Sequence, residues 1–174
     1  MIKPFFLSTF ILLSAVIIES SILSNISFLL VVPDLVLICS IYFSLLNGKF
    51  FGETQGFISG LFLDFSTGIP FGFNCLYRTI IGYVYGFFSE SIILKGIFMP
   101  VLTVGIGTIV KALLIHLTAL LFPNTDVYVT SILSYKFLFE LLANIILAPI
   151  IFRFLNLFIK SLCITSTKDK VDNV

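Results

Sequence analysis

Six ionisable side chains interrupt the long apolar segments of this chain, and they are the first candidates for chemistry. They comprise three acids and three bases, so their formal charges cancel: Asp34, Asp64, Arg78, Lys111, Lys136 and Glu140. A charge at membrane depth that lacks a partner costs at least ~2.5 kcal/mol on insertion scales. We therefore expect a paired network that faces the interior of a helical bundle. A proton relay would instead favour an excess of acids or histidines.

Two interpretations of this charged layer stay open. In the first, the pairs only fix which helices lie next to each other. In the second, the layer lines a pocket or binds the transmembrane helix of a partner. The sequence does not decide which charges pair, and Asp34 with Arg78 is one pairing open to test.

Motifs for catalysis, metal binding and cofactor binding are missing from the sequence. No G-x-S-x-G, H-E-x-x-H or phosphate-cradling glycine loop occurs. His116 has no partners at metal-ligand spacing, so we expect a hydrogen-bonded or interfacial residue. Cys39, Cys75 and Cys163 are odd in number and widely spaced, which predicts small buried apolar residues. The sequence therefore predicts no catalytic residue, no metal, no cofactor and no enzyme activity.

A stripe of glycines marks the segment that we expect to organise the bundle. Gly52, Gly56 and Gly60 recur every four residues, and Asp64 continues the register, so all four share one helix face. Such a stripe lets another backbone approach closely. The opposite face is apolar: Phe57, Ile58, Leu61 and Phe62. We interpret this segment as the central, protein-facing helix.

The composition is that of an integral membrane protein. The chain has 174 residues, of which 59% are hydrophobic and 11% are charged, and its mean hydropathy is +1.17. A soluble domain carries about 25% charged residues. The net charge of +1 does not suggest nucleic-acid binding. We predict one all-α, polytopic membrane domain over residues 1–174.

Apolar runs predict six transmembrane helices and a polar tail at 160–174. The spans are 5–23, 28–46, 50–65, 71–88, 97–121 and 132–158. The third and fourth spans are short for a bilayer core that requires ~20 residues, so a re-entrant pair stays open as an alternative. Pro33 and Asp34 fall in the first third of the second span, where proline removes one backbone donor. The freed backbone and the carboxylate are expected to bind a partner group.

The distribution of lysines predicts that both termini lie in the cytoplasm. With six spans, the inner segments hold Lys3, Lys49, Lys95, Lys160, Lys168 and Lys170. The outer loops hold only Glu19 and Asp126, which is the positive-inside pattern. Glu53 and Arg153 then lie at similar depth near the cytoplasm and are candidates for a second pair.

One ordered string of residues resembles a known family, the rod shape-determining protein MreD family. The string runs from about Val32 to Tyr83, and hydropathy alone supports the rest. It reads Pro33-Asp34-Leu35, then Tyr42, then Gly56-Phe57-x-x-Gly60-Leu61-x-x-Asp64-x-x-x-Gly68-x-x-x-Gly72, then Leu76 and Tyr83. Cys75 departs from the small alanine that the family shows more often at this place.

The resemblance implies a non-enzymatic subunit of the bacterial cell-elongation machinery in the inner (cytoplasmic) membrane. Members work with MreC, a single-span protein with a periplasmic domain, and with the actin-like MreB filament. Through them the family supports RodA and its partner transpeptidase in lateral peptidoglycan synthesis. The resemblance also implies the six-helix fold of the S-components of energy-coupling-factor transporters, which by itself implies no shared ligand.

Two further hypotheses concern the partner and the function class. Gly52, Gly56, Gly60 and Asp64 either seat the single span of MreC or hold the groove that does. The alternative function is a solute-binding subunit of a vitamin-type membrane transporter, with the charged layer as its pocket. That class docks its coupling subunit through a small-residue pair on the first span, and Ser8, Ser14 and Ala15 do not form one. A membrane enzyme is disfavoured, because no nucleophile and base stand together.

Overall fold

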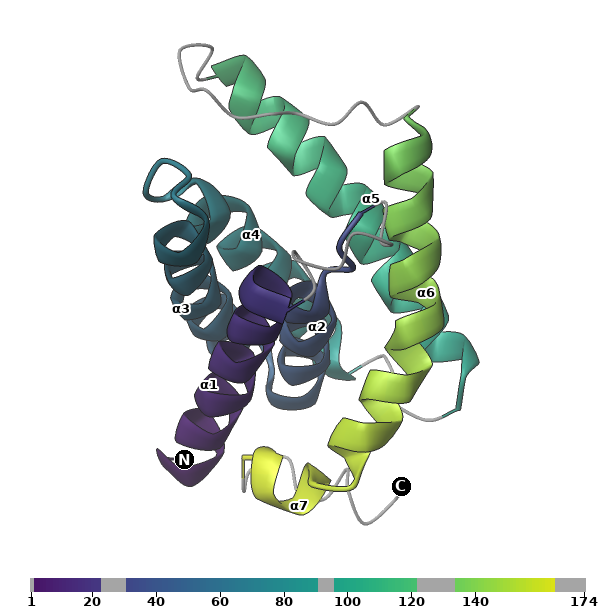
Figure 1. The fold of residues 1–174 in the computed structure, drawn as a ribbon. Helices are drawn as coiled ribbons and strands as arrows, with labels where there is room; N and C mark the ends of the chain where they lie inside the picture. The colour runs from purple at the N-terminus through teal and green to yellow at the C-terminus, as the bar shows by residue number, and fades with distance from the viewer. Residues whose placement is uncertain (1, 23–30, 91–95, 122–133, 165–174) are drawn as a thin grey trace.

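The computed structural model describes residues 2–22, 31–90, 96–121 and 134–164, and all regular structure in these residues is helical (Figure 1). The long helices are α1 (Ile2–Ile17), α2 (Leu35–Asn47), α3 (Lys49–Thr67), α4 (Phe73–Phe87), α5 (Phe98–Leu121) and α6 (Tyr135–Asn156). Shorter elements are a π-helical turn (Ile18–Ile22), a 3-10 turn (Phe88–Glu90) and α7 (Ile159–Leu162).

Three of the helical segments are long and apolar enough to cross a membrane. They are Ile2–Ser21, Phe98–Leu121 and Tyr135–Asn156. The 13 residues of α2 and the 15 of α4 extend only about 20 and 23 Å, against a hydrocarbon core of about 30 Å. The six-span arrangement therefore stays a prediction. Lys95, Asp126, Lys168 and Lys170, on which the predicted topology partly depends, lie outside the described residues.

The central helix is α2, and the prediction that the 50–72 segment carries the central helix is wrong. Every residue from Val36 to Leu46 is buried, and α2 packs against α1, α3, α4, α5 and α6. A helix that is apolar on all sides is buried either in protein or in lipid, and α2 is covered by protein. In contrast, α3 leaves Phe50, Phe57 and Phe65 exposed, because its buried residues, the glycine stripe and Gln55 among them, lie on one side of the helix.

The glycine stripe of α3 lies against the backbone of α4. A methyl group added at Gly52 would lie 2.3 Å from the carbonyl oxygen of Gly82, and one at Gly56 would lie 2.3 Å from that of Arg78. At Gly60 the added carbon would lie 2.6 Å from Cys75 Cα. Backbones approach this closely only where small residues face each other. The stripe is therefore covered within the chain, and α3 with α4 forms the most extensive helix pair.

Gly68 and Gly72 act differently from the stripe, although the sequence places them in one register. Both have positive φ, 68° and 94°, and nothing lies within 4 Å of an added carbon at either. Glycine reaches this region without steric cost. These two residues therefore shape the turn between α3 and α4 rather than a helix contact.

On the other side of α2, α5 and α6 cross each other and reach the rest of the chain through α2 and α4 (Figure 1). The start of the predicted polar tail is packed rather than loose. Leu162 and Cys163 are buried, and α7 lies against α1. Asn47 holds this segment by donating to Leu162 O (3.1 Å) and accepting from Ile164 N (2.9 Å). Residues 165–174 of the predicted tail lie outside the described residues.

Gly56→Ala is expected to destabilise the protein by about 1–3 kcal/mol, because its methyl group meets the rigid backbone of α4. Gly105→Ala is the matched control, since its methyl group meets only the flexible end of Ile145 at 3.4 Å. Thermal unfolding of the two detergent-solubilised variants measures the difference. Equal melting temperatures would show that the α3–α4 spacing is not rigid.

Candidate functional site

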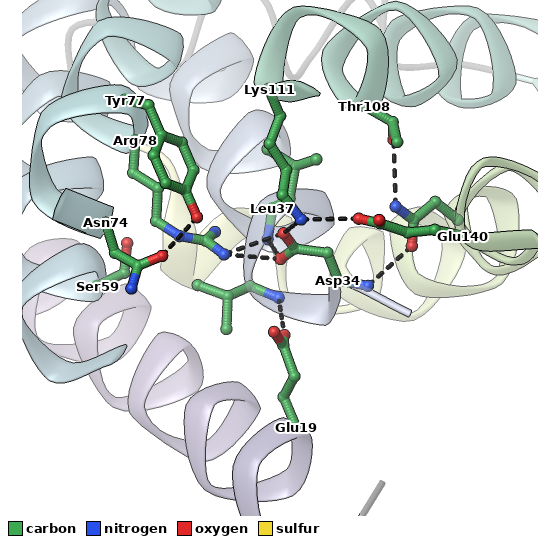
Figure 2. A network of polar contacts seen from close by, with 12 residues as sticks. Glu19, Asp34, Leu37, Ser59, Asn74, Tyr77, Arg78, Thr108, Lys111 and Glu140 are labelled. Carbon is green, nitrogen blue, oxygen red and sulfur yellow. Dashed lines mark hydrogen bonds and ion pairs between the residues drawn. The ribbon is translucent and has the colours of Figure 1, made fainter. Parts of the chain in front are cut away.

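The centre of the charged layer is the Asp34 carboxylate at the N-terminus of α2 (Figure 2). Its Oδ1 caps α2 by accepting from Leu37 N at 2.7 Å. Arg78 Nη2 lies 3.0 Å from both carboxylate oxygens, and Lys111 Nζ lies 2.6 Å from Oδ2. Asp34 is only 2% exposed. A carboxylate this deeply buried is stable only with such partners.

Lys111 continues the network to a fourth helix. Its ammonium donates to Glu140 Oε1 at 2.7 Å as well as to Asp34. The chain of ion pairs therefore runs from α4 through α2 and α5 to α6. Two acids and two bases take part, so their formal charges cancel. This network ties the α5–α6 pair to the rest of the bundle.

Pro33 determines where α2 begins. Pro33 lacks a backbone N–H and disfavours a helical residue before it. Residues 32–34 are accordingly irregular, and the helix starts at Leu35. The prediction that Pro33 and Asp34 lie inside a helical span that begins at residue 28 is therefore wrong for 32–34, while residues 28–30 lie outside the described residues.

The backbone N–H of Asp34, at the start of α2, finds its partner within the chain. Asp34 N donates to Asn144 Oδ1 at 2.8 Å, and Asn144 Nδ2 donates to Thr108 Oγ1 at 3.1 Å. Asn144 is fully buried on α6. This residue was not among the predicted site residues. The available signal was its position four residues after Glu140, which places both side chains on one face of the helix.

Glu19 is a second residue that the sequence analysis missed, because it was assigned to an outer loop. It lies in the π-helical turn after α1, and its Oε2 accepts from Val36 N at 3.2 Å. Two carboxylates therefore satisfy neighbouring N–H groups at the start of α2, where the helix dipole also favours negative charge.

Arg78 is held by more than its ion pair. Its guanidinium lies 5.5 Å from the centre of the Tyr77 ring, which is within cation–π range. The Tyr77 hydroxyl in turn donates to Asn74 Oδ1. Arg78 Nε and Nη1 are buried without a hydrogen-bond partner among the described residues. The Asp34 carboxylate is therefore the main compensation for this buried charge.

Asp64 is not part of the charge network, contrary to the sequence prediction. Its carboxylate accepts from Gly72 N (2.8 Å), Asn74 N (2.9 Å) and Asn74 Nδ2 (2.8 Å). These donors lie at the start of α4, where backbone N–H groups lack helical partners. Asp64 therefore closes the α3–α4 turn by hydrogen bonding rather than by ion pairing.

Three further residues that were predicted to form ion pairs make none with the described residues. Lys136 is exposed one residue into α6, so the prediction that it joins the network is wrong. Glu53 and Arg153 were candidates for a second pair. They lie on α3 and α6, which flank α2 on opposite sides (Figure 1).

A polar contact between α1 and α3 was also missed. Gln55 is fully buried. Its Nε2 lies within hydrogen-bond distance of Ser8 Oγ (3.0 Å), Thr9 Oγ1 (3.0 Å) and Phe5 O (3.2 Å), and its Oε1 lies 3.2 Å from Thr9 Oγ1. A buried amide with all its groups satisfied fixes the pairing of two helices.

A pocket of about 180 Å³ lies between α5 and α6, beside the Lys111–Glu140 end of the ion-pair network. Its polar lining includes Lys111, His116 and Glu140, and Ile115 and Phe137 contribute apolar walls. His116 Nδ1 lies 2.8 Å from Ala112 O. The described residues contain no group of three or more His, Cys, Asp or Glu placed to hold a metal ion.

Fold and site together define an all-helical membrane protein whose buried charges are neutralised inside the bundle. The sequence model of the rod shape-determining protein MreD family matches residues 1–158, and the chain belongs to this family of shape-determining membrane proteins. No curated protein and no solved structure gives a match.

Asp34→Asn is expected to destabilise the protein by about 3–5 kcal/mol, because Arg78 and Lys111 lose their shared carboxylate. Asparagine still caps a helix well, so the change isolates the lost charge. Lys136→Gln removes an exposed charge and is expected to stay within about 0.5 kcal/mol of the wild type. Chemical unfolding in detergent compares the two, and similar losses would contradict a central role for Asp34.

Proposed function

We propose that the protein is a non-enzymatic, multi-pass subunit of the bacterial cell-elongation complex in the cytoplasmic membrane. In this proposal it binds MreC. Through MreC and MreB it supports lateral peptidoglycan synthesis by RodA and its transpeptidase partner. Family membership supports the role in rod-shape determination, and the partners are our inference from it.

The observation that carries a scaffold rather than a catalyst is the use of the buried charges. Asp34, Arg78, Lys111 and Glu140 satisfy one another across four helices. A catalytic residue typically has a perturbed pKa and faces a substrate. Here the charged side chains hold helices in place, which suits a protein that presents a fixed surface to partners.

The glycine stripe enters this proposal in an indirect role. Because α4 covers Gly52, Gly56 and Gly60, a partner helix has no access to them. Of the two hypotheses for the stripe, we therefore propose the second. The stripe and the Asp64 turn hold the α3–α4 hairpin in the shape that the partner recognises.

The α5–α6 pocket is the one observation that favours the alternative, a solute-binding subunit of a vitamin-type transporter. Pockets that enclose drug-sized ligands measure about 300–1,000 Å³. At about 180 Å³, this pocket is too small for a vitamin and suits a smaller group. We therefore retain the scaffold as the proposed function.

Gentle-detergent affinity purification from the native membrane, followed by mass spectrometry, tests the proposed function. We expect to recover a single-span protein with a periplasmic domain together with wall-synthesis enzymes. Recovery of an ATPase pair with a membrane coupling subunit would instead establish the transporter alternative.

Gly60→Leu is expected to abolish this co-purification, because a leucine side chain forces α4 away from α3 at Cys75. Gly105→Ala is expected to keep the partner and serves as the control. Immunoblotting of the membrane fraction confirms that both variants are inserted. A Gly60→Leu protein that retains the partner would show that the hairpin shape is not what the partner recognises.

A further inference from the structure

The α5–α6 pocket presents polar atoms that the internal network does not use. Lys111 Nζ donates two of its three N–H groups to Asp34 and Glu140, which leaves one N–H for a ligand. Glu140 accepts through Oε1, and its Oε2 has no partner among the described residues. Lys111 is 15% and Glu140 17% exposed, so both side chains are within reach of a small ligand in the pocket.

His116 adds a third polar atom to the same pocket. Its Nδ1 lies 2.8 Å from the carbonyl oxygen of Ala112, which can only accept, so Nδ1 carries the proton. In the neutral ring, Nε2 is then a hydrogen-bond acceptor. The pocket therefore offers one cationic donor, from Lys111, and two acceptors, Glu140 Oε2 and His116 Nε2.

This combination suits a ligand that carries both charges. A lone anion would gain Lys111 but would face the carboxylate of Glu140, and a lone cation would meet the opposite conflict. Lys111 and Glu140 cancel each other, as do Asp34 and Arg78 behind them. An ammonium donating to Glu140 and His116, joined to an anion accepting from Lys111, uses all three groups.

The position of the pocket along α5 and α6 indicates that the zwitterionic ligand belongs to a lipid. His116 lies five residues before the end of α5, and Glu140 lies five residues after the start of α6. Each is therefore about 8 Å from its helix end. The 24 residues of α5 extend about 36 Å, which exceeds the hydrocarbon core of about 30 Å. With α5 centred on the core, about 3 Å of helix projects at each end, so His116 and Glu140 lie about 5 Å below the boundary between headgroups and acyl chains.

We propose that the α5–α6 pocket binds the zwitterionic headgroup of a phospholipid, with its ammonium on Glu140 and His116 and its phosphate on Lys111. The volume of about 180 Å³ accommodates a group the size of phosphoethanolamine. This inference goes beyond the proposed function and does not depend on MreC binding.

Native mass spectrometry of the purified full chain tests the proposal. The protein is exchanged into detergent with equal amounts of phosphatidylethanolamine and phosphatidylglycerol, and the retained lipid is identified. We expect wild type to retain phosphatidylethanolamine preferentially. Glu140→Gln gives the pocket a net positive charge, so its preference is expected to shift about tenfold toward phosphatidylglycerol, the change for one charge-assisted hydrogen bond.

His116→Phe is a second variant that leaves the ion-pair network untouched. It removes one acceptor and fills part of the pocket, so it is expected to lose phosphatidylethanolamine with an unchanged melting temperature. Glu53→Gln is the control, because it removes a carboxylate on α3, an element that contributes no residue to the pocket. It is expected to behave as wild type.

Two results would overturn the proposal. One is equal retention of the two lipids by wild type, or a preference that neither Glu140→Gln nor His116→Phe alters. The other comes from adding free O-phosphoethanolamine to the detergent-solubilised protein. If the free headgroup displaces the lipid at equal concentration, the site is one for a soluble zwitterion and the assignment to lipid is wrong.

Discussion

The structure depends on neutralising one carboxylate. Asp34 is almost fully buried, and a buried charge without partners costs far more than the whole stability of a typical domain allows. Arg78 and Lys111 supply the opposite charge, while Leu37 N and the Asn144 side chain complete its hydrogen bonding. Because these partners come from α4, α5, α2 and α6, satisfying Asp34 requires those helices to assemble in one arrangement.

Close backbone packing provides a second constraint, independent of charge. Along α3 and α4 the glycines leave no room for side chains, so dispersion contacts between main chains hold the pair together. Gln55 then attaches α1 to the same unit through hydrogen bonds. The bundle thus has two sides. Close backbone packing and hydrogen bonds hold α1, α3 and α4 together, and ion pairs attach α5 and α6.

The sequence revealed some of this arrangement and concealed the rest for physical reasons. Four-residue glycine spacing predicts close approach on one face, but periodicity does not say which helix fills that face. The cost of buried charge predicted paired side chains without deciding the pairs, and Asp34 lies beside Arg78. The prediction placed Asp64 in the same network, because the four-residue register of a helix does not show where the chain turns. The chain reverses after Asp64, which brings Gly72 and Asn74 back to its carboxylate. Glu19 was assigned to a loop, although a tertiary contact brings it to α2.

The sequence separations of these contacts imply an order of assembly during synthesis, which proceeds from the N-terminus. Asp64 finds its partners within ten residues, so the α3–α4 hairpin can close as soon as it leaves the ribosome. Asp34 must wait 44 residues for Arg78 and 77 for Lys111, and Lys111 waits a further 29 for Glu140. The nascent protein therefore carries an unpaired Asp34 until α4 is made, and then two cations that share its one carboxylate until α6 adds Glu140. The charges balance only once the last long helix is made.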